Sequence, residues 1–262
     1  GSARSLDLAT AFPQLGRLLA NCATLATPFL AAGIALATIF ATHGDRINRL
    51  YGVDLLGAGV GCAICVPLMA SVSPPGAVLL AGTSFGLAGL RGAAAEWRAL
   101  RFPLAAVALA LFGCALAARR LPDVVPDRIK TPATDSLFSS WSPVFRVDVM
   151  STPIPAIRFL IHDGTLGSSM MRFDGDLRSL AHFDVEDRSY PFVLLPPGPK
   201  VAIIGAAGGK EILASLYFQA EHVTGVELNP VTVSLLKTHF ADFTGHLTEN
   251  PRVTLVNAEG RS

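Results

Sequence analysis

Long apolar runs without charged residues dominate the first half of the chain. Asp, Glu, Lys and Arg are all absent from residues 18–44, 55–90 and 102–118. A helix needs about 20 largely apolar residues to cross the hydrocarbon core of a bilayer. The middle run is long enough for two such helices, separated by the SVSPPG segment at residues 71–76. The pattern therefore predicts about four membrane-spanning helices, near residues 20–41, 52–71, 76–91 and 102–118.

Several features favour a bilayer over the core of a soluble protein as the surroundings of these helices. A soluble helix would show a polar face beside its apolar stripe, whereas these segments are apolar nearly all round. Small residues recur four positions apart, at Gly57 and Gly61 and at Gly82 and Gly86, and this spacing allows close helix packing in lipid. A signal peptide would account for one apolar segment but not for several. We therefore expect residues 1–121 to form a transmembrane helical region.

The periodicity changes after residue 121. Residues 122–139 are rich in proline and polar side chains, which predicts a linker. Three short runs with the composition of strands follow, and the last two end in the turn pairs Asp-Gly. They predict an antiparallel meander within a small β-domain that spans residues 140–196. The expected strands cover residues 144–149, 157–161 and 170–173.

A glycine-rich turn between a strand and a helix opens the last segment, in the sequence VAIIGAAGGKEILASL. Residues 200–204 form an apolar, β-rich run of the kind found in the central strands of parallel sheets. Gly205, Gly208 and Gly209 allow the backbone to turn tightly and to approach a ligand without interference from a Cβ atom. The helix is expected over residues 211–219.

A second strand, expected at residues 223–226, ends in an acidic residue. Glu227 follows Gly205 by 22 positions, and in dinucleotide-binding folds an acid at about this distance binds the ribose hydroxyls. Asn229 and Pro230 have the character of a helix N-cap and a first helical residue. A third strand is expected at residues 252–256. This order of elements predicts a nucleoside site at the carboxyl ends of the strands.

The glycine loop has a simpler alternative explanation. Its glycines follow the pattern G-x-x-G-G and not the dinucleotide fingerprint G-x-G-x-x-G. In the alternative, Glu227 is a solvated acid at a strand end and the glycines are ordinary turn residues. The spacing of the loop, of Glu227 and of the third strand favours the nucleoside site.

These motifs, with NAEGRS after the third strand, resemble the S-adenosylmethionine-binding half of the class I methyltransferase fold. The resemblance is closest to the spermidine synthase (polyamine aminopropyltransferase) family, in its membrane-fused branch. It covers residues 141–262, and YGVDLLGAGVGC extends it into the apolar helices. It implies a multi-domain chain with an α-helical transmembrane region, a small antiparallel β-meander and the first half of an α/β Rossmann-like sheet. The Rossmann-like nucleoside-binding domain would cover residues 197–262 and be truncated at its C-terminal end.

The resemblance also implies which residues bind the cofactor and the amine. In the family the glycine loop surrounds the amino-acid and ribose part of the cofactor, and the acid after the second strand binds the ribose hydroxyls. The segment after the third strand lies against adenine. Tyr190 is the implied substrate-binding residue. The implied cofactor-binding residues are Gly205, Ala206, Ala207, Gly208, Gly209, Glu227, Leu228, Ala258, Glu259 and Gly260.

Some positions depart from the family pattern. Two loop positions are alanine and the loop has no Asp, while Pro191 and Pro143 stand where the family usually has His and Gln. The family's catalytic acid, which would deprotonate an attacking amine, follows a fourth strand. This chain stops at Ser262 after the third strand and begins with GSARS. We therefore expect a piece of a longer protein and identify no catalytic residue in it.

Three functions are consistent with these motifs. The first is a membrane-anchored, spermidine synthase-like transferase that moves an aminopropyl group from decarboxylated S-adenosylmethionine to an amine. The second is a methyltransferase that uses S-adenosylmethionine itself, and the cofactor supplies the reactive sulfonium in both cases. The third is a non-catalytic membrane protein with a vestigial nucleoside-binding domain.

Charge and residue spacing restrict the partners. Residues 1–121 carry nine Arg, no Lys and four acids, and the remainder carries a net charge of −4. No block of like charge predicts nucleic-acid binding, and no Cys or His spacing predicts a metal site. The expected partners are the lipid bilayer, a small-molecule amine or other acceptor, and a second copy in a homo-oligomer. The expected location is the bacterial inner membrane, with the nucleoside domain in the cytoplasm.

Overall fold

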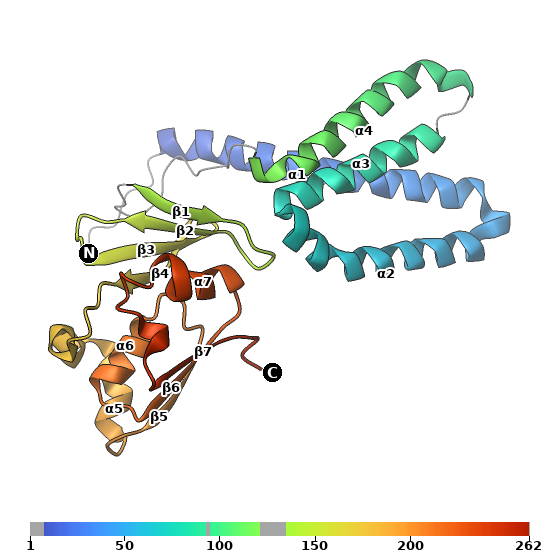
Figure 1. Ribbon diagram of the computed structural model, residues 1–262. Coiled ribbons are helices and arrows are strands. Elements are labelled where there is room, and N and C mark those ends of the chain that lie inside the picture. The colour runs from blue at the N-terminus through green and yellow to red at the C-terminus, as the bar shows by residue number, and fades with distance from the viewer. Residues whose placement is uncertain (1–7, 93–94, 121–134, 262) are drawn as a thin grey trace. The chain divides into compact units, whose positions relative to one another are not determined.

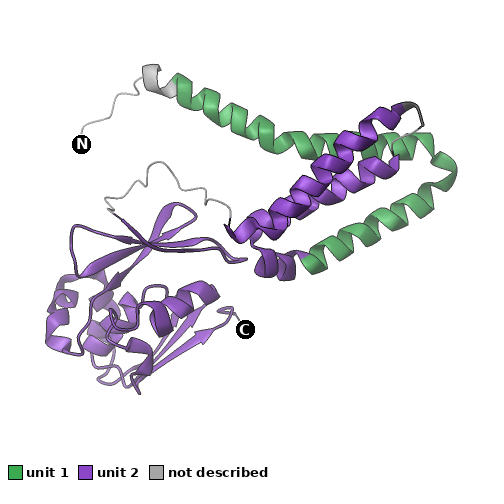
Figure 2. Cartoon of the chain, turned by 45° about the horizontal axis from the view of Figure 1, so that its top comes forward, with its two compact units in different colours: residues 1–64 green, residues 65–262 purple. Residues whose placement is uncertain are grey.

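The computed structural model describes residues 8–92, 95–120 and 135–261 (Figure 1). The chain divides into two compact units, residues 1–64 and 65–262 (Figure 2). The first unit contains helix α1 (Leu8–Thr42), a short 3-10 turn (Gly44–Arg46) and the first part of α2 (Ile47–Val72). The second unit contains the end of α2, helices α3 (Pro74–Gly92) and α4 (Arg101–Leu116), and the described strands.

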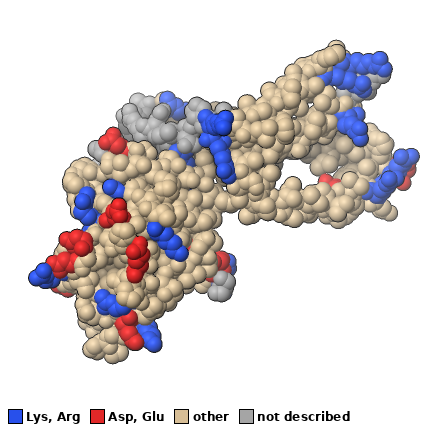
Figure 3. Space-filling view, viewed as in Figure 1, with Lys and Arg blue, Asp and Glu red and all other residues tan. Residues whose placement is uncertain are grey.

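Within the described part of the chain, three segments are long and apolar enough to cross a membrane, and they cover Phe12–Thr42, Gly44–Val72 and Trp97–Leu116. In the space-filling view, the visible sides of the long helices are almost uncharged, and basic side chains gather at the helix ends (Figure 3). The prediction of four spans is therefore corrected to three. Helix α3 forms as predicted but is not one of the three, because its 19 residues include Arg91 and two prolines beside its glycines and the Thr83-Ser84 pair.

Helices α3 and α4 pack closely through small residues. A Cβ atom added to Gly86 would lie 3.0 Å from the Cβ atom of Ala108, and one added to Gly82 would lie 3.3 Å from Leu111. The predicted role of Gly82 and Gly86 in helix packing is therefore confirmed. Gly57, in contrast, has nothing within 4 Å of an added Cβ atom among the described residues.

A valine at position 86 should separate α3 from α4. The added branched side chain would overlap Ala108, and overpacking of this kind lowers the free energy of unfolding by about 1–3 kcal/mol. Thermal unfolding in detergent should show a lower midpoint for Gly86→Val than for the matched control Gly57→Val. Equal midpoints for the two variants would contradict this packing.

The β-domain begins earlier than the sequence pattern indicates. Its antiparallel sheet has the order β1-β2-β3-β4 and four strands, where three were predicted. All but the last residue of the extra strand lies in the predicted linker at residues 122–139, of which residues 122–134 are outside the described part of the chain. Its residues alternate serine with larger side chains, and β2 pairs with it over Ser136–Ser140. The strands are β1 (Ser136–Ser140), β2 (Val147–Ser151), β3 (Ile157–His162) and β4 (Thr165–Met171).

The last segment forms a parallel sheet of order β5-β6-β7. Its strand, helix, strand and strand follow the predicted sequence of elements. Strand β5 was expected in the centre of a sheet, but in the described chain it pairs only with β6, and Ile204 is 74% exposed. The elements are α5 (Tyr190–Leu194), β5 (Lys200–Ile204), α6 (Lys210–Tyr217), β6 (His222–Glu227), α7 (Pro230–Ser234) and β7 (Val253–Asn257).

The two sheets share one hydrophobic core. Leu160 and Met170 of the antiparallel sheet are fully buried in the same cluster as Ile212 and Leu216 of α6. An isolated backbone bridge also joins Met170 to Gly209. The β-meander and the parallel sheet are therefore packed together, and the end of the glycine loop lies between them.

Candidate functional site

The glycine loop turns sharply between β5 and α6. Gly205 and Gly209 both have φ of +81°, and Ala207 has φ of +39°. The backbone N–H groups of Gly205 and Ala206 donate to the carbonyl oxygen of Val226, at 2.8 and 3.1 Å. These bonds hold the start of the loop against the end of β6.

The three predicted glycines have different structural roles. A Cβ atom added to Gly208 would collide with the carbonyl oxygen of Ser169, and one added to Gly209 would lie 2.8 Å from Leu247. Gly205 has nothing within 4 Å of an added Cβ atom among the described residues. Gly208 and Gly209 therefore permit packing within the protein, while Gly205 leaves space at the strand end.

Glu227 fixes the loop at the end of β6. Its side-chain oxygen Oε2 accepts a hydrogen bond from the backbone N–H of Ala207 at 2.9 Å, and Oε1 accepts one from Asn229 at 2.8 Å. The residue is only 6% exposed. An ionised carboxylate has about four acceptor positions, so each oxygen keeps one for a further donor.

Asn229 caps the following helix as predicted. Its Oδ1 atom accepts a hydrogen bond from the Val231 N–H at 3.0 Å. Its Nδ2 atom donates to the carbonyl oxygen of Phe145 at 3.1 Å, in the β-domain. The second bond connects residues 84 positions apart, and no local sequence pattern indicates it.

The segment after β7 comes back to the same edge of the sheet. The Ala258 N–H donates to the carbonyl oxygen of Glu227 at 3.2 Å. Glu259 pairs with Arg261 at 2.9 Å, and a Cβ atom added to Gly260 would collide with Ile204. Leu228 is half exposed next to Glu227. These residues therefore lie at one edge of the sheet, but only Gly205 and Ala207 of the implied cofactor-binding residues line the cleft beside the loop, and Ala206 is fully buried.

A cleft of about 370 Å³ opens beside the loop. Gly205 and Ala207 line it from the parallel sheet, and Ser168 and Ser169 line it from β4. Arg188 and Glu211 also line the cleft, and no sequence motif indicates either of them. The implied amine-binding residue, Tyr190, is 69% exposed at the start of α5.

Four charged side chains form a balanced cluster at this cleft. Arg188 pairs with Glu211 at 2.8 Å, and Lys210 pairs with Glu186 at 2.9 Å. Arg188 also reaches Glu186, at 3.3 Å. Burial raises the pKa of Glu186, but the hydrogen bond and charge of Lys210, with the charge of Arg188, outweigh it and lower the pKa overall.

His162, at the end of β3, is a further residue that the sequence did not reveal. Its Nε2 atom is buried and has no hydrogen-bond partner among the described residues. Burial lowers its pKa, against the raising effect of the charges on Glu227 and Asp163. The imidazole is therefore neutral at neutral pH, and the field of Glu227 reaches it.

Replacing Glu227 with Gln should loosen the loop. The amide group can accept at one oxygen only, so one of the two backbone donors loses its partner, which costs about 1–3 kcal/mol. Amide hydrogen exchange at Ala207 or Asn229 should therefore become faster. The exposed Glu221→Gln variant serves as the control. Unchanged exchange at both amides in Glu227→Gln would contradict the role of Glu227.

The pKa values of two histidines should lie on opposite sides of the ordinary value of about 6.5. The pKa of His162 should lie below about 6.5, because its buried imidazole resists protonation in the folded state. The unfolded state therefore takes up the proton first, and the free energy of unfolding should decrease as pH falls below about 6.5. For His246 the hydrogen bond and charge of Glu249, then those of Asp242, raise the pKa. The contribution of protonated His246 to the free energy of unfolding should be complete below about pH 6.5 and should be lost as pH rises through the raised pKa. NMR titration, with His162→Gln and His246→Gln to assign the signals, measures both values, and a shared pKa would contradict the prediction.

Part of the chain is similar in structure to known proteins. No family model and no curated protein matches the chain. The spermidine synthase of Thermotoga maritima has 21% identity and a TM-score of 0.37, over 49% of this chain and 41% of that one. A spermidine synthase in complex with the transition-state analogue AdoDATO has 19% identity and a TM-score of 0.36, over 54% of this chain and 52% of that one. The chain therefore spans about half the length of these proteins or less.

Proposed function

We propose that the second unit binds an adenosyl sulfonium and that the protein is a membrane-anchored, spermidine synthase-like transferase. The observation that carries this proposal is the bond between Glu227 and the Ala207 N–H of the glycine loop. It holds a carboxylate next to Gly205, at the carboxyl ends of parallel strands, where such folds bind nucleotides.

The chemistry of this edge fits an adenosine group. A ribose carries two adjacent hydroxyl donors, and Glu227 keeps one acceptor position on each carboxylate oxygen. The open space at Gly205 allows the ligand to approach the backbone. Leu228 and Ala258, on either side of Glu227, would contact the apolar part of the adenosine.

The sulfonium group of the cofactor would supply the electrophile. In aminopropyl transfer, the lone pair of an amine attacks the propyl carbon bonded to sulfur. The carbon–sulfur bond breaks, its electrons neutralise the sulfur, and the amine loses a proton to a base. Residues around the cleft would position the two reactants, and we assign that base to none of the described residues.

The charged cluster accommodates either form of the cofactor. Decarboxylated S-adenosylmethionine presents an ammonium group, for which Glu211 is a partner, and S-adenosylmethionine adds a carboxylate, for which Arg188 is a partner. Methyl transfer from S-adenosylmethionine is therefore the alternative reaction at the same site. Lys210 is directed to Glu186 instead.

One observation favours a non-catalytic protein as the second candidate. Glu227 and Gly208 both have structural roles that need no ligand, in the loop and in packing against Ser169. A vestigial domain could retain both residues for stability alone. Ligand binding distinguishes this candidate from a transferase.

The membrane helices suggest where the protein works. We propose that it lies in a bacterial inner membrane with the nucleoside domain in the cytoplasm, where the cofactor is made. The acceptor would be a small-molecule amine, and a homo-oligomer is compatible with the packing of small residues along the helices. The negative charge of the second half makes nucleic acid an unsuitable partner.

Calorimetric titration of the full-length protein in detergent tests the function. We expect decarboxylated S-adenosylmethionine to bind more tightly than S-adenosylmethionine, because Arg188, the partner for an added carboxylate, already pairs with Glu186 and Glu211. Glu227→Gln should weaken binding at least tenfold, since a hydrogen bond to a charged group contributes about 1.5–3 kcal/mol. The Glu221→Gln variant is the control. Preference for S-adenosylmethionine would indicate a methyltransferase, and binding of neither compound would indicate the non-catalytic protein.

A further inference from the structure

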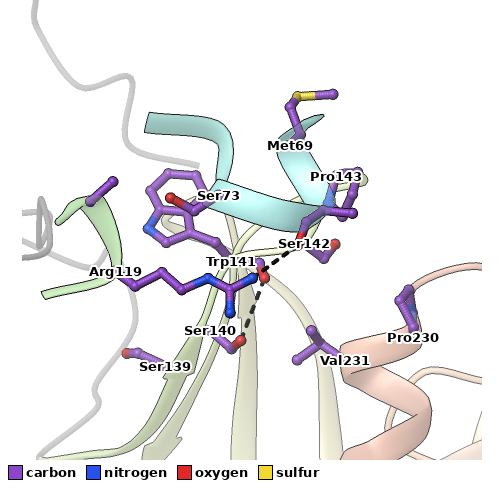
Figure 4. Close-up of a pocket in the computed structure, with 12 residues that line it drawn as sticks. Met69, Ser73, Arg119, Ser139, Ser140, Trp141, Ser142, Pro143, Pro230 and Val231 are labelled. Atoms are coloured by element: carbon purple, nitrogen blue, oxygen red, sulfur yellow. Dashed lines mark hydrogen bonds between the residues drawn. The ribbon is translucent and has the colours of Figure 1, made fainter. Parts of the chain in front are cut away.

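A pocket of about 440 Å³ lies in the second unit (Figure 4) and shares no lining residue with the cleft beside the glycine loop. One wall comes from Ser73, between α2 and α3, and from Arg119, after α4. Another comes from the end of β1 and from Trp141. Among the described residues that line the pocket none is acidic, and Arg119 is the one that carries a formal charge.

Two donors in this pocket have unused capacity. Arg119 donates from Nη2 to the carbonyl oxygen of Ala70 at 3.0 Å, and no ion pair with a described carboxylate neutralises it. A guanidinium has five N–H groups, so most of them remain for another acceptor. The Ser73 hydroxyl is buried without a partner among the described residues, in a side chain that is only 7% exposed. A buried hydroxyl of this kind requires an acceptor.

The pocket lies where two apolar helices end. Ser73 directly follows α2, and Arg119 follows α4 by three positions. Both helices belong to segments long and apolar enough to cross a membrane. A Cβ atom added to Gly76 at the start of α3 would lie 3.0 Å from the Cβ atom of Ala118, so the two ends are adjacent. Tryptophan, here Trp141, is typical of the level of the lipid headgroups.

We propose that this pocket binds the phosphate of an anionic phospholipid. The planar donors of Arg119 match the geometry of a phosphate, and the Ser73 hydroxyl supplies a second, neutral donor. The guanidinium of Arg119, with no carboxylate beside it among the described lining residues, favours a net negative headgroup over a zwitterionic one. The pocket holds the lipid at the junction between the helices and the β-domain. This site is independent of the proposed nucleoside site.

Trp141 gives a direct reporter of the lipid. The Trp97→Phe background, which removes the exposed tryptophan before α4, leaves Trp141 as the single tryptophan of the chain. The protein in detergent micelles is titrated with brominated phosphatidylglycerol or brominated phosphatidylcholine. Quenching of Trp141 fluorescence then measures occupancy. Phosphatidylglycerol should reach half-saturation at a mole fraction about fivefold lower, since one basic residue near the surface contributes about that factor to binding of anionic lipid.

Single-residue variants distinguish binding in the pocket from a general attraction of the lipid to surface charge. Arg119→Gln should remove the preference for phosphatidylglycerol. Ser73→Ala should weaken the binding of both lipids about fivefold and leave the preference unchanged, because both carry a phosphate and a neutral hydrogen bond contributes about 1 kcal/mol. Arg120→Gln removes the same charge one residue away, outside the pocket lining, and should keep the preference. Thermal unfolding in detergent verifies that each variant is folded, and Ser73→Ala tests the pocket without removing a charge.

Three outcomes would overturn the proposal. Equal quenching by the two lipids would show that the pocket has no preference for an anionic headgroup. An equal loss in Arg119→Gln and Arg120→Gln would assign the preference to surface charge. Protection of Trp141 from quenching by inorganic phosphate at millimolar concentration would assign the pocket to free phosphate and not to a lipid.

Discussion

The carboxylate of Glu227 is the group on which the candidate site depends. Its two oxygens bind the N–H groups of Ala207 and Asn229, so one side chain fixes both the turn after β5 and the turn after β6. Backbone donors in such a buried place require partners. The carboxylate supplies them, and it also brings a negative charge to the edge of the sheet. Glu227 therefore both holds the two turns in place and supplies the acceptor for a ligand.

The same junction connects the parallel sheet with the β-meander. The side chain of Asn229 caps α7 and also binds the Phe145 carbonyl oxygen of the β-domain. Gly208 lies against the backbone of Ser169, and Gly209 forms a bridge with Met170. A movement of one sheet against the other would break these contacts together. The β-meander therefore forms a fixed wall of the cleft.

The sequence predicts the local elements well because their causes are local. The length of the apolar runs predicts the long helices, and the pair Asn229-Pro230 predicts the start of α7. Contacts between distant segments are not predicted in this way. The loop pattern suggests ligand approach at Gly208, but Ser169, 39 positions earlier in the sequence, explains that glycine by packing. Arg188 lacks any motif, and only the fold brings it to the cleft. Strand β1 was hidden because its serines resemble a linker.

The contact between Gly208 and Ser169 restricts how the loop can evolve. Any side chain at position 208 would require β4 to move, and Ala206 is enclosed on all sides. Ala207 is different, because it is partly exposed and already has a positive φ, a conformation that Asp and Asn adopt more readily than most residues. Natural variation in the central loop should therefore concentrate at this single position. An acidic residue could enter the loop there by few mutational steps and without rebuilding either sheet.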